Sequence, residues 1–311
     1  MSTPSASSDV LSQAEEVRVA RQKHLVRRLN RNNAIASSIL WLITIIVAVM
    51  FVAIIINIVW TGAPAFFVSS FYGTDTRGVA SELFNSFYIL ILTEIFLLPI
   101  SLAAAIFLVE YTHQGPLVTV IHFAAETLAG VPSLVLGMFG FLVFVIDLHM
   151  GISRLAGALT LLCLNFPLAL RLFEGALGTV SREQREGALA LGATRWRSIR
   201  TVVLPSALPG IITGLILTAG KIIGEAAALL FTMGTNNPGN VFTLSPMIAS
   251  DTLTTRLYYL KQQGIGTSGL NATGEATLDA GIAATLILLL LIINVVARVV
   301  GRQIQRKLTA A

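Results

Sequence analysis

Residues 186–211 read EGALALGATRWRSIRTVVLPSALPGI and are unusually polar for the chain that surrounds them. The stretch contains three arginines, one glutamate and two Leu-Pro pairs. Of all 311 residues, by contrast, 55% are hydrophobic and only 12% are charged. Soluble domains carry about 25% charged residues, so the composition indicates an integral membrane protein. We therefore expect residues 186–211 to begin as a water-facing segment and to end by entering an apolar span.

Six apolar runs come close to the roughly 20 residues that a helix needs to cross a bilayer. The third and fourth are short, and short runs are also typical of buried or re-entrant segments. The sequence predicts an all-α integral membrane protein with six transmembrane helices. The six runs are Ile39–Trp60, Phe87–Val109, Val131–Ile146, Leu155–Leu170, Ile211–Phe231 and Ala280–Ala297.

The distribution of Lys and Arg predicts the orientation, because cytoplasmic loops are enriched in these residues. With six spans, sixteen of the 21 Lys and Arg residues fall in the N-terminal tail, the loop after the fourth span and the C-terminal end. Both termini are therefore predicted to be cytoplasmic. Basic residues at membrane ends also interact favourably with anionic lipid. The isoelectric point near 9.7 thus does not require nucleic acid as a partner.

The residue types that perform catalysis or bind metals are too scattered to indicate a site. Cys163 is the one cysteine and lies in an apolar run, and the four histidines are dispersed. Residues 214–222, GLILTAGKI, approximate a phosphate-binding loop, but the glycine spacing is off by one residue and Ile222 replaces Ser or Thr. We predict no catalytic residue, no metal site and no cofactor bound by this chain.

Lys221 and Glu225 lie near the middle of the fifth apolar run. A lysine at the bilayer centre costs roughly 2.5–3.5 kcal/mol, so it is expected to face a cavity or the interior of a bundle. Because they are four residues apart, the two residues are expected to share one helix face with small and polar side chains. They would line a substrate pathway or form an ion pair that fixes packing. Glu94 in the second run would partner Lys221 or a cation on another subunit.

The sequence Gly130-Val-Pro-Ser133 interrupts the third apolar run. Proline suits the first turn of a helix, and a helix that begins here would direct free N–H groups into the membrane, where they attract anions. Ser133 is therefore a candidate pathway residue. The alternative is an ordinary turn between an amphipathic cytoplasmic helix, Leu117–Gly130, and a buried one.

The charged stretch itself is expected to form two helices. Residues 183–193 are rich in strong helix formers. Gly192 interrupts them, a second short helix follows, and Leu204-Pro205 is expected to end it because proline disfavours helix at the preceding residue. Apolar side chains such as Leu189 and Trp196 lie among the arginines. They suit docking to a partner protein or a loop that lies on the membrane surface.

The spacing of this stretch resembles the EAA loop of bacterial ABC importer permeases, E-A-A-x3-G-x9-I-x-L-P. Gly187 for the first Ala and Val202 for Ile are the departures. The resemblance implies the type I permease fold in the bacterial cytoplasmic membrane. It also implies docking to separate ATP-hydrolysing subunits, which bind ATP and Mg²⁺. The coupling residues implied are Glu186, Gly187, Ala188, Gly192, Leu204 and Pro205.

A narrower resemblance, to the PstA type of phosphate permease, covers residues 85–306. It rests on ETLAGVPS at 126–133, GMFG at 137–140, Asn294, the charged stretch, and KIIGEAAALLFT at 221–232. The last segment usually reads RAxGETAPLLFT in this family. Lys221 therefore replaces an arginine, although an ammonium still binds phosphate as a point charge. Ala226 and Ala228 replace Thr and Pro.

The PstA resemblance implies inward transport of inorganic phosphate by alternating access, without covalent chemistry. A permease for molybdate or sulfate, or a membrane sensor or enzyme, is the alternative. The implied partners are a PstC-type permease, two PstB-type ATP-binding subunits and an extracytoplasmic PstS-type phosphate-binding protein. The predicted parts are an N-terminal cytoplasmic tail (1–33), a first transmembrane helix with an outer loop (34–84), a permease domain (85–301) with the coupling loop (174–206), and a cytoplasmic C-terminal tail (302–311).

Overall fold

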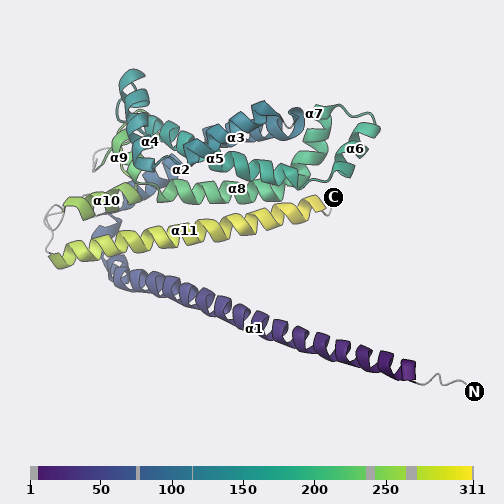
Figure 1. Ribbon diagram of the computed structural model, residues 1–311. Coiled ribbons are helices and arrows are strands. Elements are labelled where there is room, and N and C mark those ends of the chain that lie inside the picture. Colours follow the sequence, from purple (N-terminus) through teal and green to yellow (C-terminus); the bar gives the residue numbers. More distant parts are fainter. Residues whose placement is uncertain (1–5, 75–77, 114, 236–241, 264–271, 310–311) are drawn as a thin grey trace, which may run out of the picture. The chain divides into compact units, whose positions relative to one another are not determined.

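The computed structural model describes residues 6–74, 78–113, 115–235, 242–263 and 272–309 (Figure 1). Within these ranges every regular element is a helix. The chain divides into two units, residues 1–57 and 58–311, which are described in turn.

The first unit consists of most of helix α1, which runs from Ala6 to Gly62. This helix joins the charged N-terminal sequence to the first apolar run without a break. Residues 32–57 carry no charged side chain, and all of them are exposed. A helix that is apolar on every side is stable in lipid or under other helices. The first predicted span is therefore a helix of the expected character.

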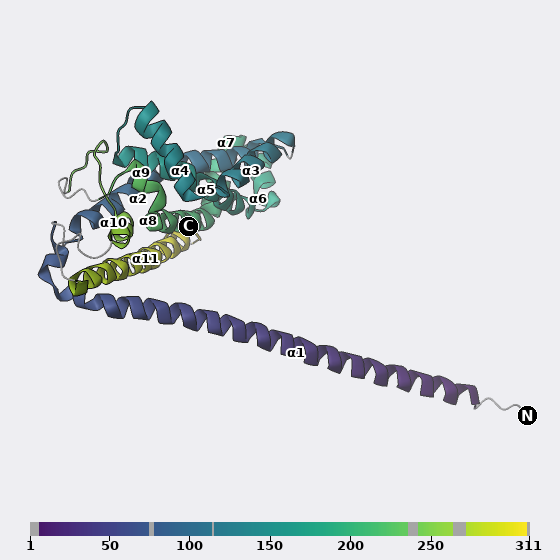
Figure 2. The same cartoon turned by 60° about the vertical axis from the view of Figure 1, so that its left-hand side comes forward.

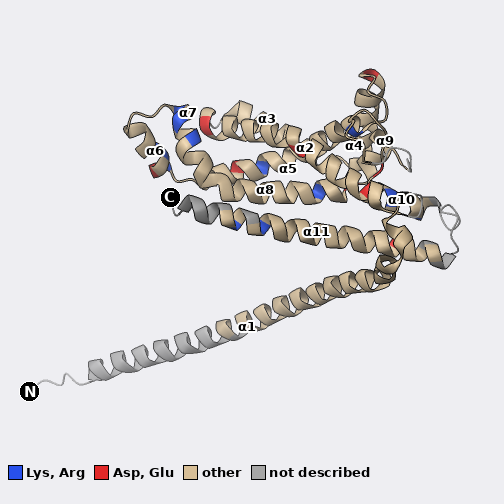
Figure 3. Cartoon of the chain, turned by 180° about the vertical axis from the view of Figure 1, so that it is seen from behind, with Lys and Arg blue, Asp and Glu red and all other residues tan. Residues whose placement is uncertain are grey.

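The second unit contains ten α-helices within the described ranges, and a π turn follows three of them directly. The spanning helices are mostly tan in Figure 3, because charged residues are sparse along them. The elements are η1 (Ala63–Phe67), η2 (Ser69–Tyr72), α2 (Ala80–Ile106), η3 (Phe107–Tyr111), α3 (Pro116–Ala129), α4 (Ser133–Gly140), η4 (Phe141–Asp147), α5 (Arg154–Gly178), α6 (Arg182–Ala190), α7 (Arg195–Ser198), η5 (Ile199–Val203), α8 (Leu204–Gly224), α9 (Ala227–Thr232), α10 (Leu253–Gln263) and α11 (Ala272–Thr309).

Five helical stretches of the described chain are long and apolar enough to cross a membrane. The sixth expected span is divided, because α3 and the α4–η4 helix meet at a bend of 100°. This bend agrees with the interpretation of residues 130–133 as a turn between two helices. The total is six when the bent pair counts as one span. The five stretches are Asn32–Phe67, Ala80–Tyr111, Arg154–Gly178, Arg195–Gly224 and Ala276–Gln303.

Helix α5 lies at the centre of the second unit and packs against α2 and α8 (Figures 1 and 2). Small residues allow α8 to approach closely, as is common between membrane helices. A Cβ atom at Gly210 would lie 2.6 Å from the Cβ of Ala176, and one at Gly214 would lie 3.0 Å from the ring of Phe173. The glycines of α8 thus serve packing against α5.

Residues 243–256, here called the outer cap because the predicted orientation places them outside, are tied to three helices by hydrogen bonds of their backbone. The first N–H groups of α5 have no partner within the helix. Two of them find carbonyl groups in the outer cap, since Arg154 N donates to Ile248 O at 3.0 Å and Leu155 N donates to Pro246 O at 2.8 Å. Leu253 N donates to Ser86 Oγ of α2 at 3.0 Å. Ser250 N reaches the carbonyl that follows α9.

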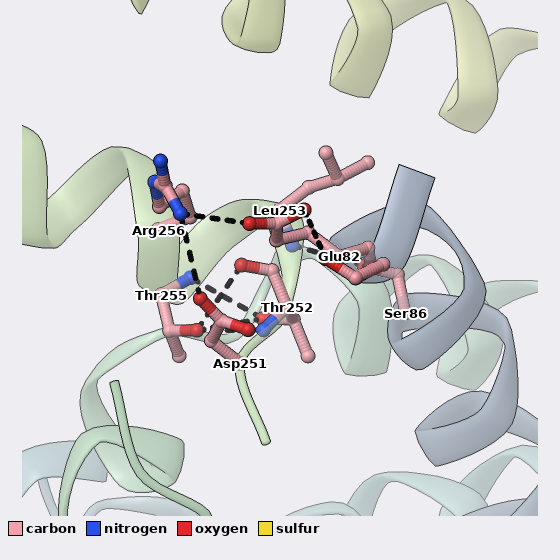
Figure 4. A network of polar contacts seen from close by, with 8 residues as sticks. Glu82, Ser86, Asp251, Thr252, Leu253, Thr255 and Arg256 are labelled. Atoms are coloured by element: carbon pink, nitrogen blue, oxygen red, sulfur yellow. Dashed lines mark hydrogen bonds and ion pairs between the residues drawn. The ribbon is translucent and has the colours of Figure 1, made fainter. Parts of the chain in front are cut away.

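Buried charges hold the outer cap to α2 (Figure 4). Arg256 Nη1 lies 2.8 Å from Glu82 Oε1 and 4.0 Å from Asp251 Oδ2, and these side chains are at most 4% exposed. Thr252 and Thr255 cap α10 reciprocally, with N···Oγ1 distances of 2.8 and 3.2 Å. The positive-inside count treats Arg256 as a loop residue, whereas the structure buries it.

A second buried arginine, Arg154, begins α5 and is fully buried. Its guanidinium group donates to Ser250 Oγ at 2.7 Å, to Asn85 Oδ1 at 2.5 Å and to Thr243 O. It also lies 4.6 Å from the centre of the Tyr88 ring, a distance typical of a cation–π contact. The two buried arginines make the outer cap an integral part of the helical unit.

We expect Arg256→Met to destabilise the protein by about 3–5 kcal/mol, because it leaves Glu82 buried without this ion-pair partner. The matched control is Lys261→Met. It removes an ion pair with Asp279 of 2.7 Å in which the lysine side chain is 65% exposed, so its cost should stay below about 1 kcal/mol. Thermal unfolding in detergent measures both variants. Equal shifts of the midpoint would show that the buried pair contributes no more than the exposed one.

Candidate substrate pathway and coupling loop

The second half of the charged stretch is continuous with a membrane span. Helix α7, the π turn η5 and helix α8 form one helical element, Arg195–Gly224. The expectation that Leu204-Pro205 ends the helix was therefore wrong. Proline lacks an N–H group and its ring clashes with the carbonyl group four residues earlier. That carbonyl belongs to Thr201, inside the π turn, where the wider turn changes the hydrogen-bond register.

The predicted glycine bend is present at Gly192, just after α6. Gly192 N donates to Leu189 O at 2.9 Å, and Ala193 N donates to Ala188 O at 3.2 Å, which is the Schellman pattern of a helix end. Gly192 has φ = +82°, a region that costs L-residues about 1–2 kcal/mol. Thr194 then caps α7 by accepting from Arg197 N at 3.3 Å. The two short helices of the coupling loop are thus fixed by specific end contacts.

A groove of about 450 Å³ lies between α6 and the α7–η5 segment. Gly187, Ala188 and Gly192 line it, as does Val202. Leu191 also lines it, and its side chain is 92% exposed. Exposed apolar side chains next to a groove are typical of a surface that binds another protein. These four EAA-like residues therefore share one hollowed surface, whereas Glu186, Leu204 and Pro205 do not line it.

Glu110 anchors the coupling loop and was missed by the sequence reasoning. Arg185 Nε lies 3.2 Å from Glu110 Oε1, and both side chains are largely buried. Arg195 Nη1 donates to the Glu110 carbonyl at 3.4 Å, and Arg185 Nη2 donates to Leu177 O at 2.7 Å. The sequence did contain a signal for this contact, because Glu110 is an acidic residue directly after the second apolar run. That run was predicted to end on the same side as the arginine-rich loop.

The coupling loop and the outer cap lie at opposite ends of α2. The outer cap contacts Glu82, Asn85 and Ser86 near the start of this helix, whereas the coupling loop contacts Glu110 just beyond its end. A Cβ atom at Gly301 of α11 would lie 3.0 Å from Ile212 of α8. The C-terminal end of α11 thus belongs to the same side as the coupling loop.

The ion pair between Lys221 and Glu225, one of the two alternatives for these residues, is not formed in the described part of the chain. Helix α8 ends at Gly224, and Glu225 is extended with φ = −81° and ψ = 127°. Its carboxylate accepts from Ala228 N at 3.3 Å, at the start of α9, and its carbonyl accepts from Thr254 Oγ1 at 2.9 Å. These contacts stabilise the break in the helix. Glu225 therefore caps α9, and within the described ranges it forms no ion pair with Lys221.

Lys221 lies on the exposed side of α8, as do Thr213 and Leu217. The stripe of small residues that the sequence reasoning placed with Lys221 faces inward instead. Gly210 and Gly214 contact α5. Lys221 is therefore separated from the packing face of its own helix.

Glu94 contacts α8, but through a threonine rather than through Lys221. Thr218 is fully buried, and its hydroxyl donates to Glu94 Oε1 at 2.8 Å. The other carboxylate oxygen, Glu94 Oε2, is buried without a hydrogen-bond partner in the described part of the chain. Glu94 thus ties α2 to α8.

Ser133 begins α4 and is half-buried. Its helix packs against α9, since a Cβ atom at Gly137 would lie 2.7 Å from the Cα of Ala228. Across the residues that the structure describes, no hydrogen bond or ion pair joins Ser133, Glu94, Lys221 and Glu225 to one another. Nor do three His, Cys, Asp or Glu side chains converge there to hold a metal ion.

Comparison with known proteins gives concordant similarities. Residues 98–310 match the family described as binding-protein-dependent transport system inner membrane component. The chain is 35% identical over 243 residues to the probable ABC transporter permease protein YqgI of Bacillus subtilis (strain 168), covering 75% of this chain and 81% of that protein. It is 30% identical over 257 residues to the phosphate transport system permease protein PstA 1 of Mycobacterium tuberculosis (strain CDC 1551 / Oshkosh), covering 80% and 84%.

The fold is similar to that of a chain in the inward-facing MetNI methionine ABC transporter. The TM-score is 0.56 at 19% sequence identity, and the match covers 76% of this chain and 99% of that chain. At this identity the likeness concerns the fold alone. It agrees with the type I importer architecture that the spacing of the charged stretch predicts.

Proposed function

We propose that this chain, which belongs to the family of binding-protein-dependent transport system inner membrane components, is a PstA-type permease subunit that carries inorganic phosphate into the cell. The similarity to a relative named as a phosphate transport permease supports the substrate. The EAA-like loop forms an exposed element of two helices, and this supports ATP hydrolysis by a partner subunit as the energy source.

The observation that carries the proposal is the continuous helix from Arg195 to Gly224. One end of it belongs to the coupling loop, and the other end carries Lys221, which lies exposed three residues before the helix stops. A helix transmits displacement along its axis because its backbone hydrogen bonds hold its length. Movement of the coupling loop therefore displaces the segment around Lys221.

In this mechanism ATP binding closes two PstB-type ATPase subunits, and their movement is delivered to the groove between α6 and α7. The chain itself performs no covalent chemistry, and ATP and Mg²⁺ are bound by those partners. The Glu110–Arg185 pair makes the end of α2 follow the loop. The Thr218–Glu94 contact ties the middle of α2 to α8. The two helices then move together between outward-open and inward-open arrangements.

The remaining partners follow from symmetry and sidedness. A chain with one EAA-like loop engages one of the two ATPase subunits, so a second permease, of the PstC type, completes the pathway. The coupling loop, the N-terminus and the C-terminus are assigned to the cytoplasm. The outer cap then faces the opposite side of the bacterial cytoplasmic membrane, where a PstS-type binding protein delivers phosphate.

Lys221 is the residue assigned to the anion. A cation in a low-dielectric path lowers the electrostatic barrier to an anion, while a single ammonium still allows release. Glu225, Glu94 and Ser133 border the path in this proposal. A point charge does not by itself distinguish phosphate from molybdate or sulfate, so these oxyanions are the second candidate substrates. ATP-driven uptake of labelled phosphate by the reconstituted complex tests the proposal, and competition by the other oxyanions distinguishes the candidates.

A further inference from the structure

A groove of about 290 Å³ lies between α8 and α11, and the transport mechanism proposed above does not use it. The two helices run side by side in Figures 1 and 3. They approach closely where Gly301 of α11 faces Ile212 of α8, and both residues line the groove. One wall is apolar and the other is polar. The residues that matter are Ile212, Ile216 and Leu217 on α8, and Asn294, Arg298 and Arg302 on α11.

The polar wall is a basic stripe without a counter-ion. Asn294, Arg298 and Arg302 are spaced by four residues and therefore share one face of α11. Within the described ranges, neither arginine forms an ion pair. Both Arg298 and Arg302 are exposed. An anion in this groove would meet two guanidinium groups that are not already neutralised by a described residue.

The depth of the groove matches the level of lipid headgroups. The last apolar run ends at Ala297, so Arg298 and Arg302 mark the end of the span, where basic side chains reach the membrane surface. The apolar wall continues from there into the span. Leu217 of α8, which lines this wall, is 48% exposed. The groove therefore has a cationic mouth and an apolar interior.

We propose that this groove binds an anionic phospholipid. The lipid phosphate lies between Arg298 and Arg302, and an acyl chain follows Ile212, Ile216 and Leu217. Guanidinium groups recognise phosphate oxygens through paired hydrogen bonds, and basic pockets between transmembrane helices are known sites for anionic lipid. Inorganic phosphate has the same anionic group as a phospholipid headgroup but leaves the apolar wall uncovered. A phospholipid binds the arginines through its phosphate and covers the apolar wall with an acyl chain.

The test uses the assembled transporter in phosphatidylcholine nanodiscs with fluorescent phosphatidylglycerol as the probe. The double variant Arg298→Gln/Arg302→Gln should weaken probe binding about 25-fold, since each basic residue near the surface contributes about fivefold. Arg298→Lys/Arg302→Lys should retain most of the binding. The matched control Arg182→Gln removes an exposed arginine of α6 and should leave binding unchanged.

A second variant tests the apolar wall with both arginines in place. Thr213 lines the groove and is exposed, so Thr213→Trp fills the space and should also abolish specific binding of the probe. Three outcomes would overturn the proposal. These are unchanged binding in both the double glutamine variant and Thr213→Trp, equal binding of fluorescent phosphatidylcholine, and full displacement of the probe by an equal concentration of inorganic phosphate, which would assign the groove to the free anion.

Discussion

A Gly192→Pro variant should insert into the membrane and lose ATP-driven phosphate uptake. Proline holds φ near −65° and has no N–H group, whereas Gly192 has φ = +82° and donates to Leu189 O at 2.9 Å. The variant cannot keep the end of α6, so α6 and α7 no longer present one groove. We expect uptake to fall to background and stimulation of the ATPase by the binding protein to disappear.

Gly151→Pro is the matched control for this experiment. Gly151 also has a positive φ, +64°, and no atom beyond its two chain neighbours lies within 4 Å of where its Cβ would be. The substitution therefore imposes a similar backbone strain outside the coupling loop and should leave most of the uptake. Normal uptake and normal ATPase stimulation in Gly192→Pro would contradict the coupling role of the loop.

Lys221→Met should reduce phosphate uptake by about ten- to a hundredfold without loss of assembly. The loss corresponds to roughly 1.5–3 kcal/mol, as for a hydrogen bond to a charged group. Lys221 is exposed on α8 and within the described ranges forms no ion pair. The substitution therefore leaves no described acid unpaired. Lys221→Arg should keep most of the activity because it keeps the cation.

Glu225 supplies the control for this second experiment. Glu225→Gln retains an oxygen that accepts from Ala228 N, so the start of α9 should be preserved and uptake only mildly changed. If Lys221 served only to neutralise Glu225, the double variant Lys221→Met/Glu225→Gln would transport normally. We expect it to stay as inactive as Lys221→Met. Recovery of uptake in the double variant would remove Lys221 from the pathway.

The features that could be predicted from the sequence are those indicated by hydrophobic runs and by the spacing of residues in a motif. Apolar runs predicted the positions of the spanning helices, and the sequence Gly130-Val-Pro-Ser133 predicted the turn between α3 and α4. The spacing of the EAA-like stretch led to the family, and the glycine that interrupts strong helix formers led to the bend at Gly192. These patterns depend on local chain geometry and on the solvent around each segment, both of which one sequence contains.

The features that could not be predicted depend on contacts between distant residues. The break at Glu225 is stabilised by Thr254, 29 residues later, so the assumption of a continuous helix through Lys221 and Glu225 failed. The helix continues through Pro205, although proline disfavours helix at the preceding residue, because the π turn η5 changes the hydrogen-bond register there. From the sequence, Arg154 and Arg256 counted as loop charges, whereas in the structure both are buried by contacts that involve the outer cap. Hydropathy is a local property of the sequence, so it does not predict contacts between residues that are distant in the chain.

The most direct measurement of the central claim is phosphate transport by the complete complex. This chain is purified with the second permease and the two ATPase subunits, reconstituted into liposomes, and supplied with the binding protein and ATP. We predict accumulation of labelled phosphate that requires ATP and the binding protein and persists in excess molybdate or sulfate. The absence of ATP-dependent accumulation, or its suppression by either competing oxyanion at equal concentration, would contradict the assignment as a phosphate permease.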